Sequence, residues 1–221
     1  MNRCAGRSLG GMTMRTTALQ PGTPPRLILN AFVHPRGLTG HLGGFVMARS
    51  RAQQQEIADL LDEPGELLCE LGAGPGLMAT LLAERHPQLR LALVDPSPVM
   101  RSQAARRCAD LITNARVTIA DGMAENLGLA DASCDTVLAV NSVALWPNPS
   151  AALAEIHRVL RPGAQVVLSW HSSTASSANQ RRLALPADAI KDLMAALASV
   201  FDDARQHDLT HSTAWTARRS L

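Results

Sequence analysis

The stretch "LLCELGAGPGLMATLLAER", residues 67–85, decides the fold of this 221-residue chain. It starts with an apolar run, passes through Glu70 into three glycines at alternate positions, and ends in apolar residues at helical spacing. That order predicts a strand, a tight turn and a helix. Glycines let a ligand lie against the backbone, and the first turn of a helix presents free N–H groups. The stretch therefore predicts a ligand site around Gly72, Gly74 and Gly76.

The turn does not follow the two common phosphate-binding patterns. Dinucleotide binding requires Gly-x-Gly-x-x-Gly, but the sixth position is Leu77 when counted from Gly72 and Ala79 when counted from Gly74. No Gly-Lys-Ser/Thr is present either. Glu70 would repel a pyrophosphate and suits a cationic ligand, although its burial is costly without hydrogen bonds. An NAD-dependent oxidoreductase is therefore kept only as a minor alternative.

Outward from this stretch, strand-like and helix-like segments alternate. Apolar runs typical of buried strands occupy residues 66–71, 89–94, 115–120, 135–140 and 164–170. Five strands alternating with helices predict an α/β fold, in which a parallel sheet carries helices on both faces. Right-handed crossovers place the carboxyl ends of all these strands along one edge, where open α/β sheets bind ligands.

The flanking segments extend this pattern. Ile57, Leu60 and Leu61 indicate a helix that stops before Pro64–Gly65, and Ser97 and Asn148 are predicted to cap two further helices that begin with proline. Residues 171–182 form a Ser-rich break. Beyond it we expect an amphipathic helix over 190–201 and a hairpin from 204–209 and 213–219.

Acidic residues end three of the predicted strands. Glu70 ends the first, Asp95 follows the second at 19 residues beyond Gly76, and Asp121 follows the third. A carboxylate at the end of the second strand, where Asp95 lies, can hold both hydroxyls of a ribose. Asp121 could accept a hydrogen bond from an adenine amino group. These acids favour a nucleoside that carries a ribose, an adenine and a positive charge but no phosphate.

In these residues and the motifs around them, the chain resembles class I S-adenosylmethionine-dependent methyltransferases of the small type 11, UbiE-like kind. The motifs are "ELGAGPG", "VDPSPVM", "ADGMAENLGLADASCDTVLAVNSVALWPNP" and "EIHRVLRPGAQVVLSW", in family order between residues 66 and 170. The resemblance implies S-adenosyl-L-methionine as cofactor. It also implies a Rossmann-like, doubly wound, mostly parallel seven-stranded sheet of order 3-2-1-4-5-7-6 with its last strand antiparallel. Ala164 departs from the family, which usually has a second glycine there.

The resemblance also assigns roles to individual residues. Residues 72–74 should line the methionine and ribose, with Glu70 organising the loop near the amino group of the cofactor and Asp95 holding the ribose hydroxyls. Residues 96, 100 and 121–123 should lie around the adenine, although both methionines among them could simply be core. Asn141 should lie under the methionine part. The cofactor-binding residues predicted in this way are Glu70, Gly72, Ala73, Gly74, Gly76, Asp95, Pro96, Met100, Asp121, Gly122, Met123 and Asn141.

The acceptor is expected to be a small organic molecule. The loop after the fourth strand reads "NSVALW" rather than the Asn/Asp-Pro-Pro-aromatic motif of base-amine methylation, and no Pro-Cys nucleophile is present. Methyl transfer needs mainly alignment of the two reactants, so no fixed catalytic set is expected. His171 and Trp146 are weak candidates for a base and an apolar wall. A cofactor-binding regulatory protein without catalysis is the alternative.

Composition excludes several other classes. The net charge of +2 gives no argument for nucleic acid or an anionic membrane, and no apolar run reaches the roughly 18 residues of a membrane span. The four cysteines have no metal-ligand spacing, and reduced thiols in a cytoplasmic protein are expected. We expect a disordered tail over 1–22, with Met1, Met12 or Met14 as the start, and one domain over 23–221. That domain divides into a lid and helix (23–64, the lid around Gly40–Met47), a cofactor-binding core (65–171) and a C-terminal helix and hairpin (172–221).

Overall fold

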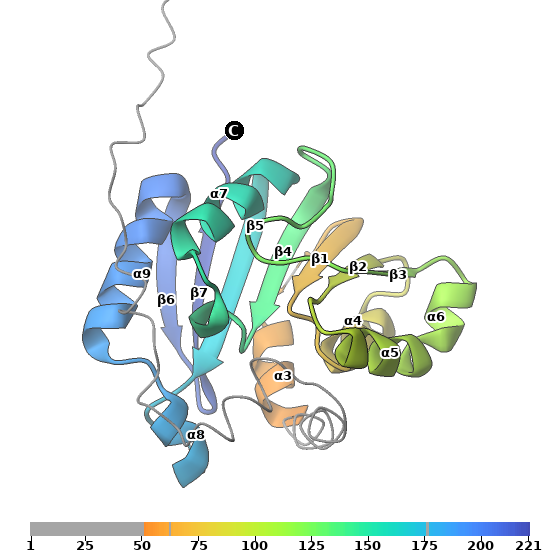
Figure 1. Cartoon of the computed structure of the whole chain (residues 1–221). Coiled ribbons are helices and arrows are strands. Elements are labelled where there is room, and N and C mark those ends of the chain that lie inside the picture. The colour runs from red at the N-terminus through yellow and green to blue at the C-terminus, as the bar shows by residue number, and fades with distance from the viewer. Residues whose placement is uncertain (1–50, 62, 176) are drawn as a thin grey trace, which may run out of the picture.

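The computed structural model describes residues 51–61, 63–175 and 177–221. They form a seven-stranded sheet of order β3-β2-β1-β4-β5-β7-β6 (Figure 1). β7 runs antiparallel to both of its neighbours, while the first five strands pair in parallel. This topology confirms the order implied by the resemblance. The strands are β1 (Leu67–Leu71), β2 (Arg90–Val94), β3 (Val117–Ala120), β4 (Cys134–Val140), β5 (Leu160–His171), β6 (Asp202–Asp208) and β7 (Ser212–Arg218).

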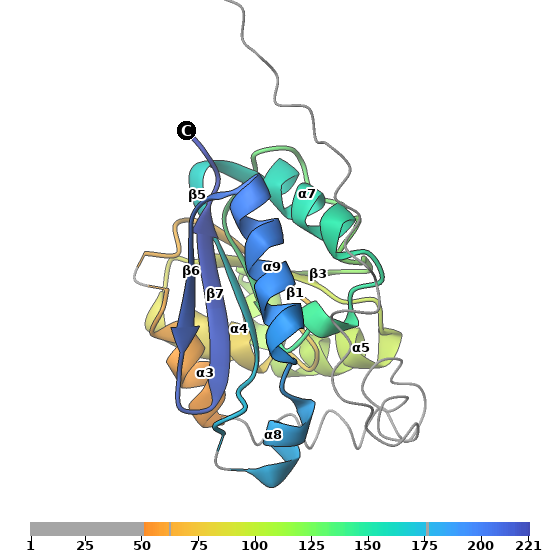
Figure 2. The same ribbon diagram turned by 90° about the vertical axis from the view of Figure 1, so that its left-hand side faces the viewer.

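Helices cover both faces of the sheet. Figure 2 shows α3 and α4 on one side and α7 and α9 on the other. The helices are α3 (Arg51–Ala58), α4 (Leu77–Arg85), α5 (Pro98–Arg107), α6 (Ala109–Thr113), α7 (Pro149–Val159), α8 (Ala178–Leu183) and α9 (Ala187–Val200), with a 3₁₀ turn η1 (Val143–Leu145) after β4. The expected caps are confirmed, since Ser97 Oγ accepts from Met100 N and Asn148 Oδ1 accepts from Ala151 N.

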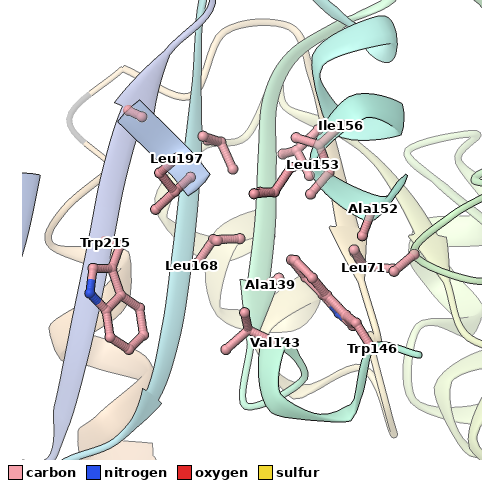
Figure 3. Close-up of a cluster of buried hydrophobic side chains, with 14 of the residues drawn as sticks. Leu71, Ala139, Val143, Trp146, Ala152, Leu153, Ile156, Leu168, Leu197 and Trp215 are labelled. Atoms are coloured by element: carbon pink, nitrogen blue, oxygen red, sulfur yellow. The ribbon is translucent and has the colours of Figure 1, made fainter. Parts of the chain in front are cut away.

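Two hydrophobic cores follow from the alternation of side chains along the strands. Leu168 and Trp215 pack under α7 and α9 together with Leu153 and Leu197 (Figure 3). On the other face, Leu68, Leu91 and Val167 pack against α3, α4 and α5. A fully buried aliphatic side chain contributes roughly 1.5–3 kcal/mol, so these two layers hold the strand ends in register.

Several segments differ from the sequence prediction; β5, for example, begins at Leu160 rather than at residue 164, and α6 was not predicted. α3 ends at Ala58 rather than shortly before Pro64, because the chain tightens into turns in which Leu60 N donates to Ile57 O and Leu61 N to Ala58 O, both at 3.1 Å. Leu61 stays buried all the same. The Ser-rich break contains the short helix α8, whose end is fixed where Trp170 Nε1 donates to Leu183 O at 2.5 Å.

The predicted tail over 1–22 and lid around 40–47 lie outside the described residues, as does Cys4. Within the described ranges, the helices are too short or too polar for any of them to cross a membrane.

Candidate active site at the carboxyl edge of the sheet

The fold brings the predicted strand-end residues to one edge. The register pairs Leu71 with Val94 and Val94 with Ala120, so β1, β2 and β3 end side by side. Glu70 pairs with Leu138 of β4 on the other side. Glu70 and the residues that follow β2, β3 and β4 (Asp95, Asp121 and Asn141) therefore line the same carboxyl edge.

The glycine turn folds tightly over the ends of β2 and β4. Gly72 N and Ala73 N both donate to Val94 O, at 2.8 and 3.3 Å. Gly72, Gly74 and Gly76 have φ values of 70°, 55° and 78°, a region that favours glycine. A Cβ on Gly72 would lie 2.7 Å from Ser142 Cβ. The turn thus requires its first glycine for both conformation and space.

Gly76 has a packing role that the sequence prediction did not include. A Cβ at this position would lie 3.2 Å from Ala104 and from Cys108 Sγ. The glycine therefore lets the start of α4 approach α5 closely. Its contact with a cofactor stays a prediction.

Replacing Gly72 with alanine is expected to lower the free energy of unfolding by about 2–4 kcal/mol, because left-handed strain and the overlap with Ser142 add together. Urea unfolding measures the loss. Gly128→Ala is the matched control, since Gly128 has a φ of 67° but open space around its Cβ position. The control is expected to lose only about 1–2 kcal/mol. Equal losses in the two variants would contradict the steric argument.

Glu70 is a buried acid with a free oxygen. Its exposed fraction is 3%, and Oε2 has no hydrogen-bond partner among the described residues. Burial, and secondarily the negative charge of Asp95, raise the pKa of Glu70 from 4.5 to about 8. The side chain therefore holds a proton at neutral pH, and a cation beside it would favour the ionised form.

Asp95 anchors the glycine turn to the end of β2. Oδ2 accepts from Gly74 N and Oδ1 accepts from Ser97 N, both at 2.8 Å. Burial raises the pKa of Asp95, and these two hydrogen bonds work in the opposite direction. Each oxygen keeps a second lone pair, so the carboxylate can still accept from two neighbouring hydroxyls.

The predicted adenine side is more open. Asp121 is exposed and forms an ion pair at 2.9 Å with Arg101 Nη1, which also donates to Asp95 O at 2.7 Å. The prediction that Asp121 accepts from an adenine amino group did not include this ion pair. A Cβ on Gly122 would lie 2.6 Å from Val94 Cγ1, so the backbone passes very close to β2 here.

The apolar residues assigned to the adenine differ in exposure. Met100 is buried with 2% exposed, as expected of a core residue, whereas Met123 is 47% exposed and Pro96 is also exposed. Met123 is therefore free to contact a ligand, and the contacts of all three with adenine stay predictions.

Asn141, which follows β4, has a partner that sequence reasoning missed. Its side chain exchanges two hydrogen bonds with Gln53 of α3, Nε2 to Oδ1 at 3.1 Å and Nδ2 to Oε1 at 3.0 Å. Gln53 is 1% exposed. Helical spacing could have indicated that Gln53 is buried, because it lies four residues before Ile57 and therefore on the same face of the helix.

The two weak catalytic candidates are both largely buried. Trp146 is 7% exposed and packs in the core with Leu71 and Ala139 (Figure 3), and its Nε1 has no partner among the described residues. Burial lowers the pKa of His171 to about 4, so its imidazole is neutral at pH 7. Nδ1 of His171 also has no hydrogen-bond partner among the described residues, and that part of the chain contains no cluster of three or more His, Cys, Asp or Glu suited to a metal ion.

Comparison with known proteins agrees with this arrangement. The sequence profile of a family described as "Methyltransferase domain" matches residues 69–168. The chain is 26% identical over 157 residues to the uncharacterized methyltransferase YdaC of Bacillus subtilis, covering 70% of this chain and 84% of YdaC. It is 34% identical over 113 residues to the ubiquinone/menaquinone biosynthesis C-methyltransferase UbiE of Rubrivivax gelatinosus, covering 51% of this chain and 42% of UbiE.

A solved structure shows the same fold. A putative S-adenosyl-L-methionine-dependent methyltransferase from Methanococcus maripaludis superposes with a TM-score of 0.68 at 17% identity, covering 81% of this chain and 93% of that one. The family match contains the glycine turn, all three strand-end acids and the length of β4 and most of β5. Residues 69–168 therefore resemble the methyltransferase-domain family, and the described residues share the Rossmann-like fold of this solved structure.

Proposed function

We propose that this protein transfers a methyl group from S-adenosyl-L-methionine to a small organic acceptor. The observation that carries the proposal is Glu70, a buried acid with an unpartnered oxygen directly before the glycine turn, beside Asp95. A cation bound beside Glu70 would favour its ionised form, which a phosphate would not do, so the site favours a cationic nucleoside.

The residues present fit the cofactor. S-adenosylmethionine carries a positive sulfonium, an ammonium group and a ribose with two free hydroxyls. The unpartnered Glu70 oxygen suits the positive charge, and the remaining lone pairs of Asp95 suit the hydroxyls. The tight backbone at Gly72 and Gly122 brings main chain, rather than side chains, to the edge. The residues proposed to hold the cofactor are the twelve predicted above, from Glu70 to Asn141.

When bound, the cofactor supplies an electrophilic methyl group. Passage of this methyl group to a nucleophilic atom of the acceptor would break its bond to sulfur and release S-adenosylhomocysteine, so the task of the chain is to hold the two molecules in line and exclude water. Well-oriented reactions of this type gain effective molarities of up to roughly 10⁵–10⁸ M. Neutral His171, with its low pKa, is suited to orienting an acceptor rather than to deprotonating one, and Trp146 is suited to an apolar wall.

The acceptor class rests on two features of the sequence. The net charge is close to zero, and the motif of base-amine methylation is missing after β4. UbiE is named as a C-methyltransferase of quinone biosynthesis, which supports a small organic acceptor here as well. Cys69, Cys108 and Cys134 carry free thiols, which supports a reducing cytoplasmic compartment.

Two experiments test the proposal. Isothermal titration calorimetry with S-adenosylmethionine and S-adenosylhomocysteine should show binding, and NADH should not compete; no signal with either compound would refute the proposal. Label transfer from methyl-labelled donor to fractions of a cell extract then tests turnover. Binding without transfer to any fraction would favour a regulatory protein that binds the cofactor without catalysis.

A further inference from the structure

Two sets of side-chain hydrogen bonds join α3 to the carboxyl edge of the sheet. Figure 1 shows this helix at the end of β4. Near its start, Gln53 pairs with Asn141, and one turn later Glu56 Oε2 accepts from His211 N at 3.0 Å and from Ser212 Oγ at 3.5 Å. Both ties join residues that are far apart in the sequence. Only the first of them reaches a residue of the candidate cofactor site.

Both polar atoms of the Gln53 amide take part in this contact. Its oxygen and its nitrogen each bond to the side chain of Asn141, and the residue is 1% exposed. Burying an amide is costly unless it is hydrogen-bonded, so an apolar residue would serve packing alone at least as well. The amide is therefore explained by what it does to Asn141.

Asn141 lies where the end of β4 meets the glycine turn. Its φ is +53°, a conformation that asparagine tolerates better than most residues, and its N–H donates to Ser169 O at 3.0 Å. The next residue, Ser142, donates through Oγ to Leu71 O and abuts Gly72. Asn141 is only half buried, and after pairing with Gln53 its amide keeps one N–H and one lone pair.

We propose that Gln53 is a positioning residue for the methyl donor: it fixes the Asn141 amide in one orientation, with the remaining donor and acceptor available to the methionine part of the cofactor. This inference rests on the proposed function. A side chain held in its binding orientation before the ligand arrives loses less entropy on binding, which increases affinity. Gln53 acts through Asn141 rather than by contact with the reacting atoms.

The first test is Gln53→Met, which keeps the length and helix propensity of the side chain but removes both hydrogen bonds. Calorimetry is expected to show about five- to tenfold weaker binding of S-adenosylmethionine and of S-adenosylhomocysteine. Binding of 5′-methylthioadenosine, which has the nucleoside but no amino-acid part, should stay unchanged. An equal loss for all three ligands would contradict a role at the methionine part.

Glu56→Met is the matched control, because it removes the other tie of α3 with the same replacement residue one turn away. It is expected to lower the midpoint of thermal unfolding without weakening donor binding. Equal loss of affinity in the two variants would show that Gln53 only fastens the helix, and would overturn the inference.

A double-mutant cycle provides the second readout. If Gln53 acts through Asn141, the double variant Gln53→Met, Asn141→Ala binds donor as weakly as Asn141→Ala alone. If the losses of donor affinity in the two single variants multiply in the double variant, the two residues act independently and the inference is overturned. Absence of donor binding in the unmodified protein would instead refute the proposed function, so the two failures are distinguishable.

Discussion

Replacing Asp95 with alanine is expected to weaken S-adenosylmethionine binding at least about 100-fold. The carboxylate has a free lone pair on each oxygen after accepting from Gly74 N and Ser97 N. Two charge-assisted hydrogen bonds to ribose hydroxyls, at about 1.5–3 kcal/mol each, correspond to this loss. The substitution also releases the glycine turn from the end of β2, which adds to the effect. Isothermal titration calorimetry measures the change.

The variant must be separated from one that simply unfolds. Asp110→Ala removes an exposed acid from α6 and serves as the matched control, with affinity expected to be unchanged. Circular dichroism confirms that both variants are folded at the titration temperature. Near-normal binding by folded Asp95→Ala protein would mean that the ribose is held elsewhere.

Replacing Glu70 with glutamine is expected to stabilise the protein without ligand, and increasingly so as pH rises. The pKa of Glu70 is about 8 in the folded chain and near 4.5 when unfolded. Between these values the folded state keeps a proton that the unfolded chain has lost, so stability falls with rising pH by about 1.4 kcal/mol per unit. The full loss, complete above pH 8, is roughly 5 kcal/mol. Glutamine does not titrate, so the Glu70→Gln variant does not lose this stability as the pH rises.

Urea unfolding at several values between pH 4.5 and 8.5 measures this difference. The two proteins should be nearly equally stable at the acid end, and the curves should diverge steadily toward the alkaline end. Asp95 is present in both, so its own titration largely cancels. Parallel curves would show that Glu70 ionises normally. The same variant is expected to bind the donor more weakly, because it no longer offers a negative charge to the cation.

Most of the fold could be predicted because its signals are local. The glycine turn, the two Ser/Asn-Pro caps and the apolar strands each depend on residues close in sequence, and the structure confirms them. The seven-stranded order came from the resemblance rather than from periodicity. α8 was missed because its six residues follow a Ser-rich segment with no apolar repeat.

The site could be predicted only in part. Glu70 and Asp95 could be assigned to the site because each lies at the end of a predicted strand, and parallel strands end at the same edge of the sheet. Gln53 was missed because its role depends on Asn141, 88 residues away, and its two Gln neighbours look identical in the sequence. The ion pair of Asp121 with Arg101 spans 20 residues and depends on how α5 packs against β3. Long-range polar pairing of this kind has no local signature.

The two outer strands of the sheet have a consequence for association between molecules. β6 reads "DDARQHD" and is largely exposed along its length, whereas β3 at the opposite edge has only four residues. An exposed edge strand can template pairing with another chain, and charge and shortness both oppose it. Three aspartates on β6 place negative charge along this edge. Both edges of the sheet are therefore protected against strand-by-strand aggregation.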